Sequence, residues 1–369
     1  MTRRRKVVNQ FMKQVDNIAD WRIKSAHDIQ AATPATRLYG RKRMKIATKL
    51  LAGTALALMT MGAAAQAKTL RLNHNNPEDH PTHISMQKMA DQVEEETGGE
   101  LKIRIYANGQ LGTQRESTEQ VQNCSLDMAR SNAAELEAFV PAYAVFNLPY
   151  LFADEAHFDA VSQGEIGQKI LDAGVENGIR GLAYYTEGAR SFYAGKPILS
   201  PADLKGMKIR VQPSPSAVRM VELLGGNPTP IGWGELYSAL QQGVVDGAEN
   251  NPTALTTARH GEVAKHFSLD EHTVIPAVMF ISNCAWDELT PEHQEIVARA
   301  ARESMIAHGE TWTEVSQAAI EEARSELGVE VHEVDKAPFI EAVQPMYDEA
   351  RAADPMIGEL VDQIRAAAP

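Results

Sequence analysis

The hydrophobic pattern of the chain becomes regular from Thr69 onward and follows the periods of strands and helices in turn. A short strand is predicted at 69–72, and apolar positions alternate with polar ones at 101–105 and 207–211, as in half-buried strands. After His80 and Pro81 the apolar residues recur at helical spacing, and a Gly-Gly pair ends this predicted helix. The order of strand, helix and strand indicates an α/β sheet.

The rest of the chain continues this alternation. Helices are predicted at 115–123, after the strand at 207–211 as far as residue 224, and at 234–242. Strands are predicted at 126–130, 181–185 and 244–248, and a buried strand or crossover is predicted at 274–282. From Pro291 to about Leu327 the pattern is helical and is interrupted only by Gly309. Because this exceeds the usual length of a globular helix, we expect the helix to break or to run along more than one domain.

Length and charge narrow the classes of protein. The chain has 369 residues, enough for two domains of medium size. Its formal net charge is −13, but the first 67 residues hold 13 of the 36 basic residues and only 3 of the 49 acidic ones. The remainder therefore carries about −23, and so acidic a body repels nucleic acid and anionic lipid. We expect neither as a partner.

The segment that begins at Met44 has the pattern of a secretory signal peptide. Two lysines precede an apolar stretch at 50–61, and Ala65-Gln66-Ala67 predicts cleavage before Lys68. The alternative, a transmembrane anchor, would need a longer apolar run. The residue directly after the cleavage site is Lys68 and not a cysteine, so we expect no lipid anchor and a protein that is free in the periplasm. Residues 1–43 fit no part of this pattern, and we expect translation to start at Met44.

The sequence contains only two cysteines, Cys124 and Cys284, which lie far apart. A single disulfide is possible in an oxidising compartment, but spacing alone does not establish the geometry that a disulfide needs. Two buried free thiols are therefore the favoured expectation, and the pairing stays open.

Common catalytic and metal-binding motifs are absent from the sequence. It contains no Gly-x-Ser-x-Gly, no phosphate-binding glycine loop, no His-Glu-x-x-His and no Cys-x-x-Cys. His74, His80 and His83 lie close together, but they straddle a loop and a helix start, so we interpret them as polar loop and helix-capping residues. We expect no metal and no cofactor.

Two arginines have positions that suit a binding site. Arg210 lies at the end of an alternating strand, and Arg190 follows another strand. Guanidinium groups at strand ends can point into the crevice where α/β sheets bind ligands, and arginine binds a carboxylate in a bidentate manner. For a single arginine, the alternative is a surface pair with one of the many acidic residues.

Four segments together resemble the solute receptors of TRAP (tripartite ATP-independent periplasmic) transporters, the DctP family. They are GQLG at 109–112, NLPYLF at 147–152, DLKGMKIR at 203–210 and PTPIGWGELYSALQQGVVDGAENN at 228–251. The resemblance runs from about Lys68 to the C-terminus. It implies an α/β fold of the two-lobed periplasmic binding protein type (type II-like), with crossing strands and a long helix that spans both lobes. The implied lobes are 68–187 with 276–315, and 188–275 with 316–369.

The resemblance also implies the residues that bind ligand. Arg210 matches the arginine that pairs with the ligand carboxylate, Arg190 is a second guanidinium contact, and Asn250 orients the carboxylate from the opposite side. Trp233 occupies an aromatic wall position. The remaining ligand-binding residues implied are Asn75, Gln114, Asn132 and Glu249. Some relatives, such as sialic-acid receptors, are acidic where this chain has Asn132, and neutral amides suit hydroxyl groups.

The expected protein is therefore a monomeric periplasmic receptor rather than an enzyme. Its expected ligand is a small organic monocarboxylate, a sugar acid such as a hexuronate or aldonate, and its expected partner is a TRAP permease of small and large integral subunits. Two alternatives stay open. One is a binding protein for an ATP-driven importer or a sensor kinase; the other is a periplasmic lyase or hydrolase, for which His272 and Glu249 are the candidate bases.

Overall fold

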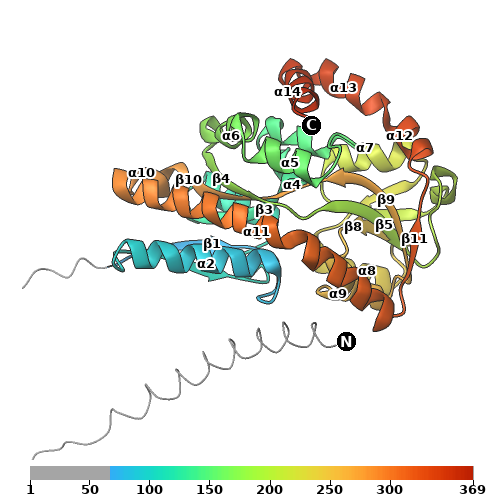
Figure 1. Ribbon diagram of the computed structural model, residues 1–369, viewed down its shortest axis with the longest axis horizontal. Coiled ribbons are helices and arrows are strands. Elements are labelled where there is room, and N and C mark those ends of the chain that lie inside the picture. The colour runs from blue at the N-terminus through green and yellow to red at the C-terminus, as the bar shows by residue number, and fades with distance from the viewer. Residues whose placement is uncertain (1–66, 369) are drawn as a thin grey trace, which may run out of the picture. The chain divides into compact units, whose positions relative to one another are not determined.

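The computed structural model describes residues 67–368, which form two β-sheets flanked by helices (Figure 1). The first sheet has the strand order β2-β1-β3-β10-β4. Its strands are β1 (Lys68–Asn73), β2 (Leu101–Tyr106), β3 (Met128–Asn132), β4 (Ile179–Tyr185) and β10 (Ala277–Ser282). The first three are parallel, and β10 runs antiparallel between β3 and β4. Every residue of β10 is buried, which explains its uninterrupted apolar run.

The second sheet has the order β11-β9-β5-β8-β6-β7. Its strands are β5 (Ala189–Ala194), β6 (Lys208–Val211), β7 (Asn227–Pro230), β8 (Gly247–Asn250), β9 (His266–Val274) and β11 (Glu330–Glu333). Strand β6 is parallel to both β7 and β8, whereas β5 is antiparallel to β8 and β9. At the outer edge, β11 pairs with β9 in parallel. Both sheets therefore contain parallel and antiparallel pairs.

Helices cover the two sheets. They are α2 (Pro81–Glu96), α3 (Gln114–Gln122), α4 (Ala133–Leu136), α5 (Glu155–Ser162), α6 (Glu165–Asp172), α7 (Pro215–Leu223), α8 (Trp233–Gln241), α9 (Thr253–Thr256), α10 (Asn283–Asp287), α11 (Pro291–Ser325), α12 (Ala337–Val343), α13 (Pro345–Ala353) and α14 (Pro355–Ala366), with short 3-10 turns that include η1 (Pro141–Asn147). Helix α2 begins where expected, because the His80 side chain accepts a hydrogen bond from the Thr82 amide. No helix within residues 67–368 is both long and apolar enough to cross a membrane.

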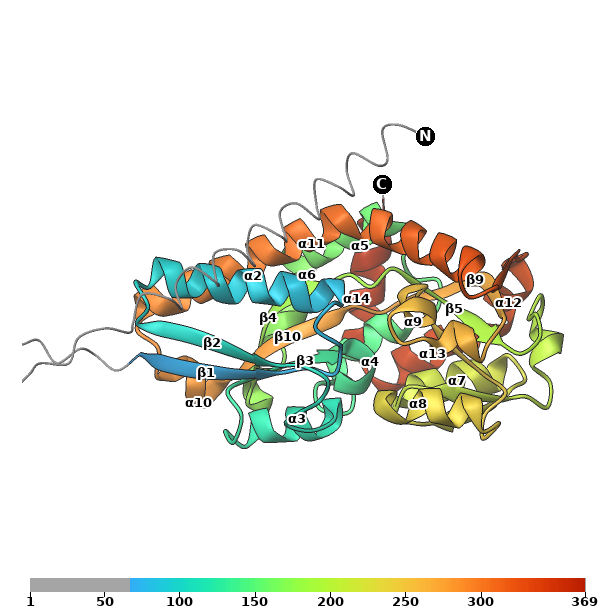
Figure 2. The same ribbon diagram turned by 90° about the horizontal axis from the view of Figure 1, so that it is seen from below.

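The long helix α11 runs along both parts of the molecule (Figure 2). Its first half packs on α2 and β4, and its second half packs on α9 and β11. In its middle, His308 Nε2 lies 2.9 Å from the carbonyl oxygen of Thr186, in the connection between β4 and β5. The expectation of one helix that spans both lobes is confirmed.

The C-terminal helices return to the first sheet's side. Helix α12 packs on β9 and α7, but α14 packs on α6 and η1. The His157 imidazole contacts the carbonyl oxygen of Ile364 in α14 at 2.8 Å, and Tyr347 in α13 donates to the carbonyl of Pro149 at 2.6 Å. Residues 345–366 therefore lie against the part of the chain that the sequence analysis assigned to the other lobe.

Cys124 and Cys284 form a disulfide, with their Cα atoms 5.9 Å apart. The favoured expectation of two free thiols is therefore wrong. The sequence separation of 160 residues conceals that β3 and β10 are antiparallel neighbours, so the loop before β3 and the helix after β10 meet at one end of the sheet.

Several predicted elements are displaced by a few residues. The strands expected at 126–130 and 244–248 begin later, at Met128 and Gly247, because Leu126 and Val245 are buried residues of the preceding loops. The apolar segment at 274–282 is the end of β9, a crossover at 275–276 and then β10. Helix α11 ends at Ser325, two residues before the predicted end.

Candidate ligand-binding site

One pocket is lined by residues of both sheets and their connections. The empty space among its lining residues is about 400 Å³ when open solvent is included. The first sheet's side contributes Asn75, Asn76, His80, Gln114, Arg130, Asn132 and Glu187, and the second contributes Arg190, Arg210, Gln212, Trp233, Asn250, Asn251, Thr253, Ala254 and Thr257. Polar and charged side chains dominate this lining, so the pocket suits a polar ligand.

Strand pairing brings the second sheet's polar residues to one edge. Asn250 ends β8, and Arg210 is the next-to-last residue of β6, which runs parallel to β8. Arg190 lies at the start of β5, which is antiparallel to β8. The end of β8 and the start of β5 therefore meet at the same edge, the place where α/β sheets gather ligand-binding groups.

Arg190 is occupied by protein partners. Its Nε donates to Glu249 Oε2 at 2.6 Å, and its Nη2 donates to Glu249 Oε1 at 3.0 Å and to the Glu249 carbonyl at 2.9 Å. Its Nη1 donates to Asn250 Oδ1 at 2.8 Å. Burial disfavours the charged form, but the Glu249 carboxylate outweighs it and raises the pKa of Arg190.

Arg210 has the opposite surroundings. Its side chain is 1% exposed, and its Nε donates to the carbonyl of Ile231 at 2.8 Å. Its Nη1 is buried and has no hydrogen-bond partner within the described part of the chain. Burial lowers the pKa of Arg210, and the positive charge of Arg190 adds to this effect, although Glu249 opposes it. A buried guanidinium with an unsatisfied donor is a binding group for an anion.

The first sheet contributes a second buried ion pair and a set of amides. Arg130 pairs with Glu187 through its Nη2, and its Nη1 donates to Asn75 Oδ1 at 3.0 Å and to Gln114 Oε1 at 3.1 Å. Asn132 donates through Nδ2 to Glu187 Oε2 at 3.2 Å, while its Oδ1 is buried without a partner among residues 67–368. The charge of Arg130 is therefore compensated, whereas Asn132 retains an unused acceptor.

Glu249, the partner of Arg190, belongs to a network of buried charged side chains. His272 lies between two carboxylates, with Nδ1 2.7 Å from Asp270 Oδ2 and Nε2 3.4 Å from Glu249 Oε2. Burial disfavours the imidazolium, but Asp270 outweighs it and raises the pKa of His272 to about 9. Burial likewise opposes ionisation of Glu249, but Arg190 and His272 lower its pKa to about 2. Both groups are charged at neutral pH and balance one another.

An aromatic side chain stands at the pocket wall opposite the amides. Trp233 begins α8, and its ring centroid lies 5.1 Å from that of His260. Burial and the nearby Arg210 lower the pKa of His260 to about 3, so this imidazole is neutral. Trp233 therefore gives the pocket an aromatic surface that is backed by a neutral imidazole.

Comparison with known proteins identifies the family. Residues 72–354 match the family model described as bacterial extracellular solute-binding protein, family 7. The chain belongs to this family. It is a TRAP periplasmic solute-binding protein, and thus a receptor rather than an enzyme.

Similar solved structures carry bound sugar acids. A TRAP periplasmic solute-binding protein from Xanthobacter autotrophicus Py2, solved with β-D-galacturonate, is 42% identical over 80% of this chain and 99% of its own, with a TM-score of 0.78. Another, from Anaerococcus prevotii with α/β D-glucuronate, is 35% identical over 81% of this chain and 98% of its own, with a TM-score of 0.79. The 2,3-diketo-L-gulonate-binding periplasmic protein of Escherichia coli is 30% identical over 79% of this chain and 89% of its own.

The TRAP receptor fold brings together seven of the eight residues that the sequence analysis assigned to ligand. Those on the pocket wall are Asn75, Gln114, Asn132, Arg190, Arg210, Trp233 and Asn250. The eighth, Glu249, lies behind Arg190 and is 2% exposed, so its carboxylate is positioned to hold the arginine rather than to reach the pocket. The individual roles of these residues remain predictions.

Several pocket residues of this receptor were not predicted from the sequence. Arg130 occupies the centre of a strand whose five residues are all buried, and a charged residue inside such a strand is a signal that could have been used. Glu187 and Gln212 follow strands, and Gln212 Oε1 is buried without a partner in the described residues. His74, His80 and His83 form no three-ligand metal cluster within residues 67–368. Burial, His83 and Arg130 lower the pKa of His74 to about 3.

Proposed function

We propose that this TRAP receptor binds a hydroxylated monocarboxylate, a hexuronate or an aldonate, and delivers it to a membrane permease of small and large subunits. The observation that carries the proposal is the unsatisfied Nη1 of Arg210 in a pocket that is otherwise charge-balanced. A ligand carboxylate bound there would form charge-assisted hydrogen bonds with the guanidinium.

The balance of charges around the pocket favours an anion with a single charge. Arg130 is paired with Glu187, Arg190 with Glu249, and His272 with Asp270. Burial raises the pKa of Glu135, which is hydrogen-bonded to Gln114, although the charges of Arg210 and Arg130 oppose this shift. Among residues 67–368, Arg210 is then the one buried cation without a bonded carboxylate. A second carboxylate on the ligand would be buried without a counterion, at a cost in affinity.

The uncharged polar groups of the pocket suit hydroxyls. The buried oxygens Asn132 Oδ1 and Gln212 Oε1 need donors, and a carboxylate has none to offer. A hydroxyl group can donate to either oxygen. Asn250 Oδ1 is already used by Arg190, which leaves the Asn250 Nδ2 group available as a donor to the ligand. The bound galacturonate and glucuronate of the similar structures are acids with several hydroxyls.

We also propose the route by which the protein reaches its site of action. The segment at 44–67 lies outside the described residues except for Ala67, and the first strand begins at Lys68, the predicted first residue after cleavage. Export with cleavage before Lys68 would therefore leave the fold whole. We propose the lobes given in the sequence analysis, with residues 345–366 moved to the first lobe. The contacts of α14 with α6 and η1 support this change.

Calorimetry with a matched set of ligands tests the proposed ligand class. At least one of D-galacturonate, D-glucuronate and D-gluconate should bind tightly. Galactose and glucose should not bind. Galactarate, which adds a second carboxylate to the same hydroxylated chain, should bind at least about tenfold more weakly than galacturonate, a difference of about 1.4 kcal/mol. Tight binding of a neutral sugar, or of galactarate in preference to galacturonate, would contradict the proposal.

A further inference from the structure

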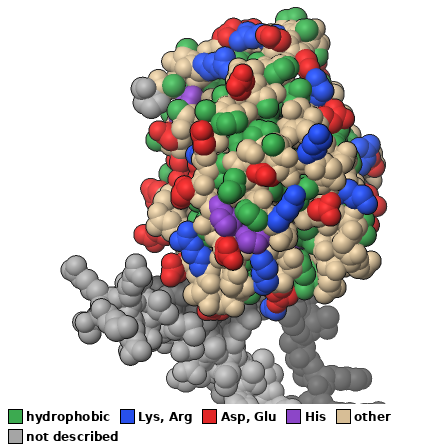
Figure 3. Space-filling view, turned by 90° about the vertical axis from the view of Figure 1, so that its right-hand side faces the viewer, with side chains coloured by type: hydrophobic (Ala, Val, Ile, Leu, Met, Phe, Trp, Pro, Cys, Tyr) green, Lys and Arg blue, Asp and Glu red, His purple; other side chains and the backbone are tan. Residues whose placement is uncertain are grey.

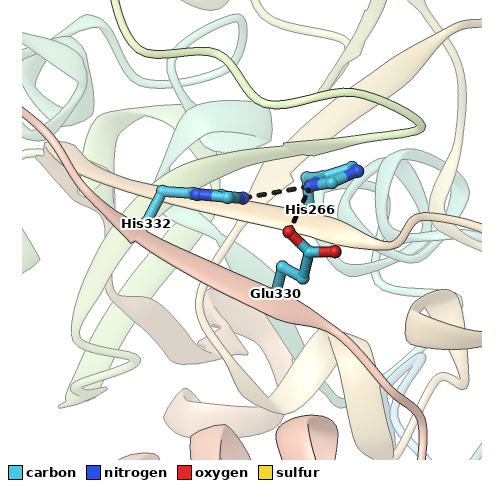
Figure 4. Close-up of side chains that lie close together, drawn as sticks. All are labelled: His266, Glu330 and His332. Atoms are coloured by element: carbon cyan, nitrogen blue, oxygen red, sulfur yellow. Dashed lines mark hydrogen bonds and ion pairs between the residues drawn. The ribbon is translucent and has the colours of Figure 1, made fainter.

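Two histidines and a glutamate meet at the outer edge of the second sheet, far along the strands from the ligand pocket. We call this group of His266, Glu330 and His332 the edge cluster. His266 Nδ1 lies 3.0 Å from His332 Nε2 and 3.7 Å from Glu330 Oε2 (Figure 4). One candidate ligand atom from each of the three residues lies within 4.8 Å of the others. None of the three lines the ligand pocket.

The strand register builds this cluster on rigid backbone. Glu330 and His332 are two residues apart in β11, so their side chains point to the same face. His266, the first residue of β9, is the register partner of Glu330 in the parallel pair of strands. Figure 4 shows the two imidazoles directed toward each other, with the Glu330 carboxylate beside them. Groups that are held by paired strands need little rearrangement to bind an ion.

The chemistry of these groups is that of a first-row transition metal site. Two imidazole nitrogens and one carboxylate oxygen form the protein ligand set of some zinc sites, with water in the fourth position. Zinc–nitrogen bonds of about 2.0–2.1 Å in a tetrahedron place neighbouring ligand atoms about 3.3 Å apart. The distances of 3.0 and 3.7 Å in the edge cluster bracket that separation.

The edge cluster is also accessible from solvent. The Glu330 side chain is 70% exposed and the His266 side chain 20% exposed, so an ion can enter and Glu330 can change rotamer to complete the site. Figure 3, which faces the end of the molecule that carries β11, shows histidine side chains gathered in one patch. We propose that the edge cluster binds one Zn²⁺ ion or a related divalent transition metal ion.

A bound ion would join the edge strand β11 to β9, its one partner strand in the described sheet. Strand β11 is the edge strand and pairs only with β9 in the described sheet, over four register pairs. It follows α11, and β9 leads into the crossover to the first sheet. A metal bridge between them would stabilise this edge when bound, because an ion that binds only the folded state shifts the unfolding equilibrium.

Zinc titration of variants tests the proposal. The protein is purified from the periplasm without a polyhistidine tag, and ZnCl2 binding is measured by calorimetry for wild type, His266→Gln, His332→Gln and His293→Gln. His293 is the matched control, because its Nε2 lies 3.6 Å from Glu100 Oε2 at similar exposure but without a second imidazole. Wild type and the control should bind one equivalent of Zn²⁺. The two edge-cluster variants should bind at least about tenfold more weakly, since loss of even an outer-sphere partner costs that much.

Two further measurements separate metal binding from a folding defect. Circular dichroism without zinc should be the same for all four proteins, and ZnCl2 should raise the melting temperature of wild type and control but not of His332→Gln. Absence of a one-equivalent site in wild type, or unchanged zinc affinity in both edge-cluster variants, would overturn the proposal. Galacturonate binding is a separate measurement, so failure of the zinc site and failure of the proposed transport ligand are distinguishable.

Discussion

Arg190 and Arg210 line the same pocket, yet they have different partners and should respond differently to substitution. Every nitrogen of Arg190 donates to Glu249 or Asn250, whereas Arg210 has one backbone acceptor and a buried Nη1 without one in the described residues. Arg190 therefore has a structural role that Arg210 lacks. We expect Arg210 to bind the ligand and Arg190 to stabilise the sheet edge that carries the binding residues.

Replacing Arg210 should abolish tight binding without unfolding the protein. Arg210→Ala should weaken binding of the identified sugar acid by about 2–5 kcal/mol, or roughly 30- to several-thousand-fold. Arg210→Lys should recover little, because an ammonium group cannot reproduce the planar fork. Calorimetry compares both with Arg219→Ala, a control at an exposed arginine paired with Glu349. An Arg210→Ala protein within about threefold of wild type would show that the carboxylate binds elsewhere.

Arg190→Ala should act on folding instead. It leaves Glu249 buried beside only His272, and breaking a buried pair costs about 3–5 kcal/mol. Urea unfolding without ligand should therefore show a large loss of stability for Arg190→Ala and a small one for Arg210→Ala. The reverse order of stabilities would contradict the assigned roles.

Because His272 is cationic in the folded state, the free energy of unfolding should decrease when alkaline pH removes its proton. The folded pKa of about 9 lies above the ordinary 6.5, so the folded state binds the proton more tightly. Its contribution is fully present below pH 6.5 and is lost as the pH rises through 9. Glu249 has the opposite sign: its pKa is lowered from 4.5 to about 2, so its contribution is fully present above pH 4.5 and is lost as the pH falls through 2.

The His272→Gln variant tests this dependence. Melting temperatures of wild type should fall between pH 6.5 and 9, and this slope should be smaller in the variant. On the acid side the sign is opposite: His74 and His260 have folded pKa values of about 3, so both proteins should lose stability as the pH falls below 6.5. Equal alkaline slopes in the two proteins would show that His272 is not cationic.

At the scale of elements, the connection between β4 and β5 depends on a glycine against α11. Gly188 has φ of +62°, and a Cβ placed on it would lie 2.5 Å from Trp312 Nε1. Gly188→Ala should therefore destabilise the protein by about 1–3 kcal/mol through backbone strain and overpacking. Gly195→Ala, where a Cβ meets nothing within 4 Å, is the control. If urea unfolding gave the same free energy of unfolding for both variants, the prediction for Gly188 would be wrong.

The disulfide ties two elements of the first sheet together. A Cys124→Ser, Cys284→Ser double variant should be less stable than wild type by about 2–4 kcal/mol. Ligand affinity should be nearly unchanged, because neither cysteine lines the pocket. Thermal unfolding with and without reductant should give a shift in wild type and none in the variant. A stability insensitive to both reductant and substitution would argue against a formed disulfide.

The local elements follow from the sequence because the periods of helices and strands are local signals. Trp233 and Asn250 were implied instead by the resemblance of the segment at 228–251 to TRAP receptors, and both line the pocket. Contacts between distant segments are not visible in this way. Arg130 forms its ion pair with Glu187, which is far away in the sequence. His266 contacts His332 only because β9 and β11 pair in this register. The return of α14 to the first sheet is likewise set by packing rather than by periodicity.

At the scale of the whole molecule, the pocket's two-sided lining predicts closure on the ligand. The first sheet's side supplies Arg130 and Asn132, and the second supplies Arg210 and Asn250. A ligand that contacts both sides should favour the closed arrangement through hinge motion at the connections between the sheets. Small-angle scattering should show a smaller radius of gyration with saturating ligand, and no change for Arg210→Ala at the same concentration. Identical wild-type curves with and without bound ligand would exclude closure.

The position of β10 has a consequence for the order of events during synthesis and export. This strand lies between β3 and β4, although it follows them by more than ninety residues. The chain emerges from its N-terminus first. The edges of β3 and β4 that pair with β10 therefore stay unpaired until the chain has been synthesised as far as residue 282. The strands β5 to β9 are complete earlier and are contiguous in sequence, so five of the six strands of the second sheet can pair before β10 is available; the edge strand β11 follows later. Because exposed strand edges promote aggregation, the nascent protein is most vulnerable in the interval before β10 inserts.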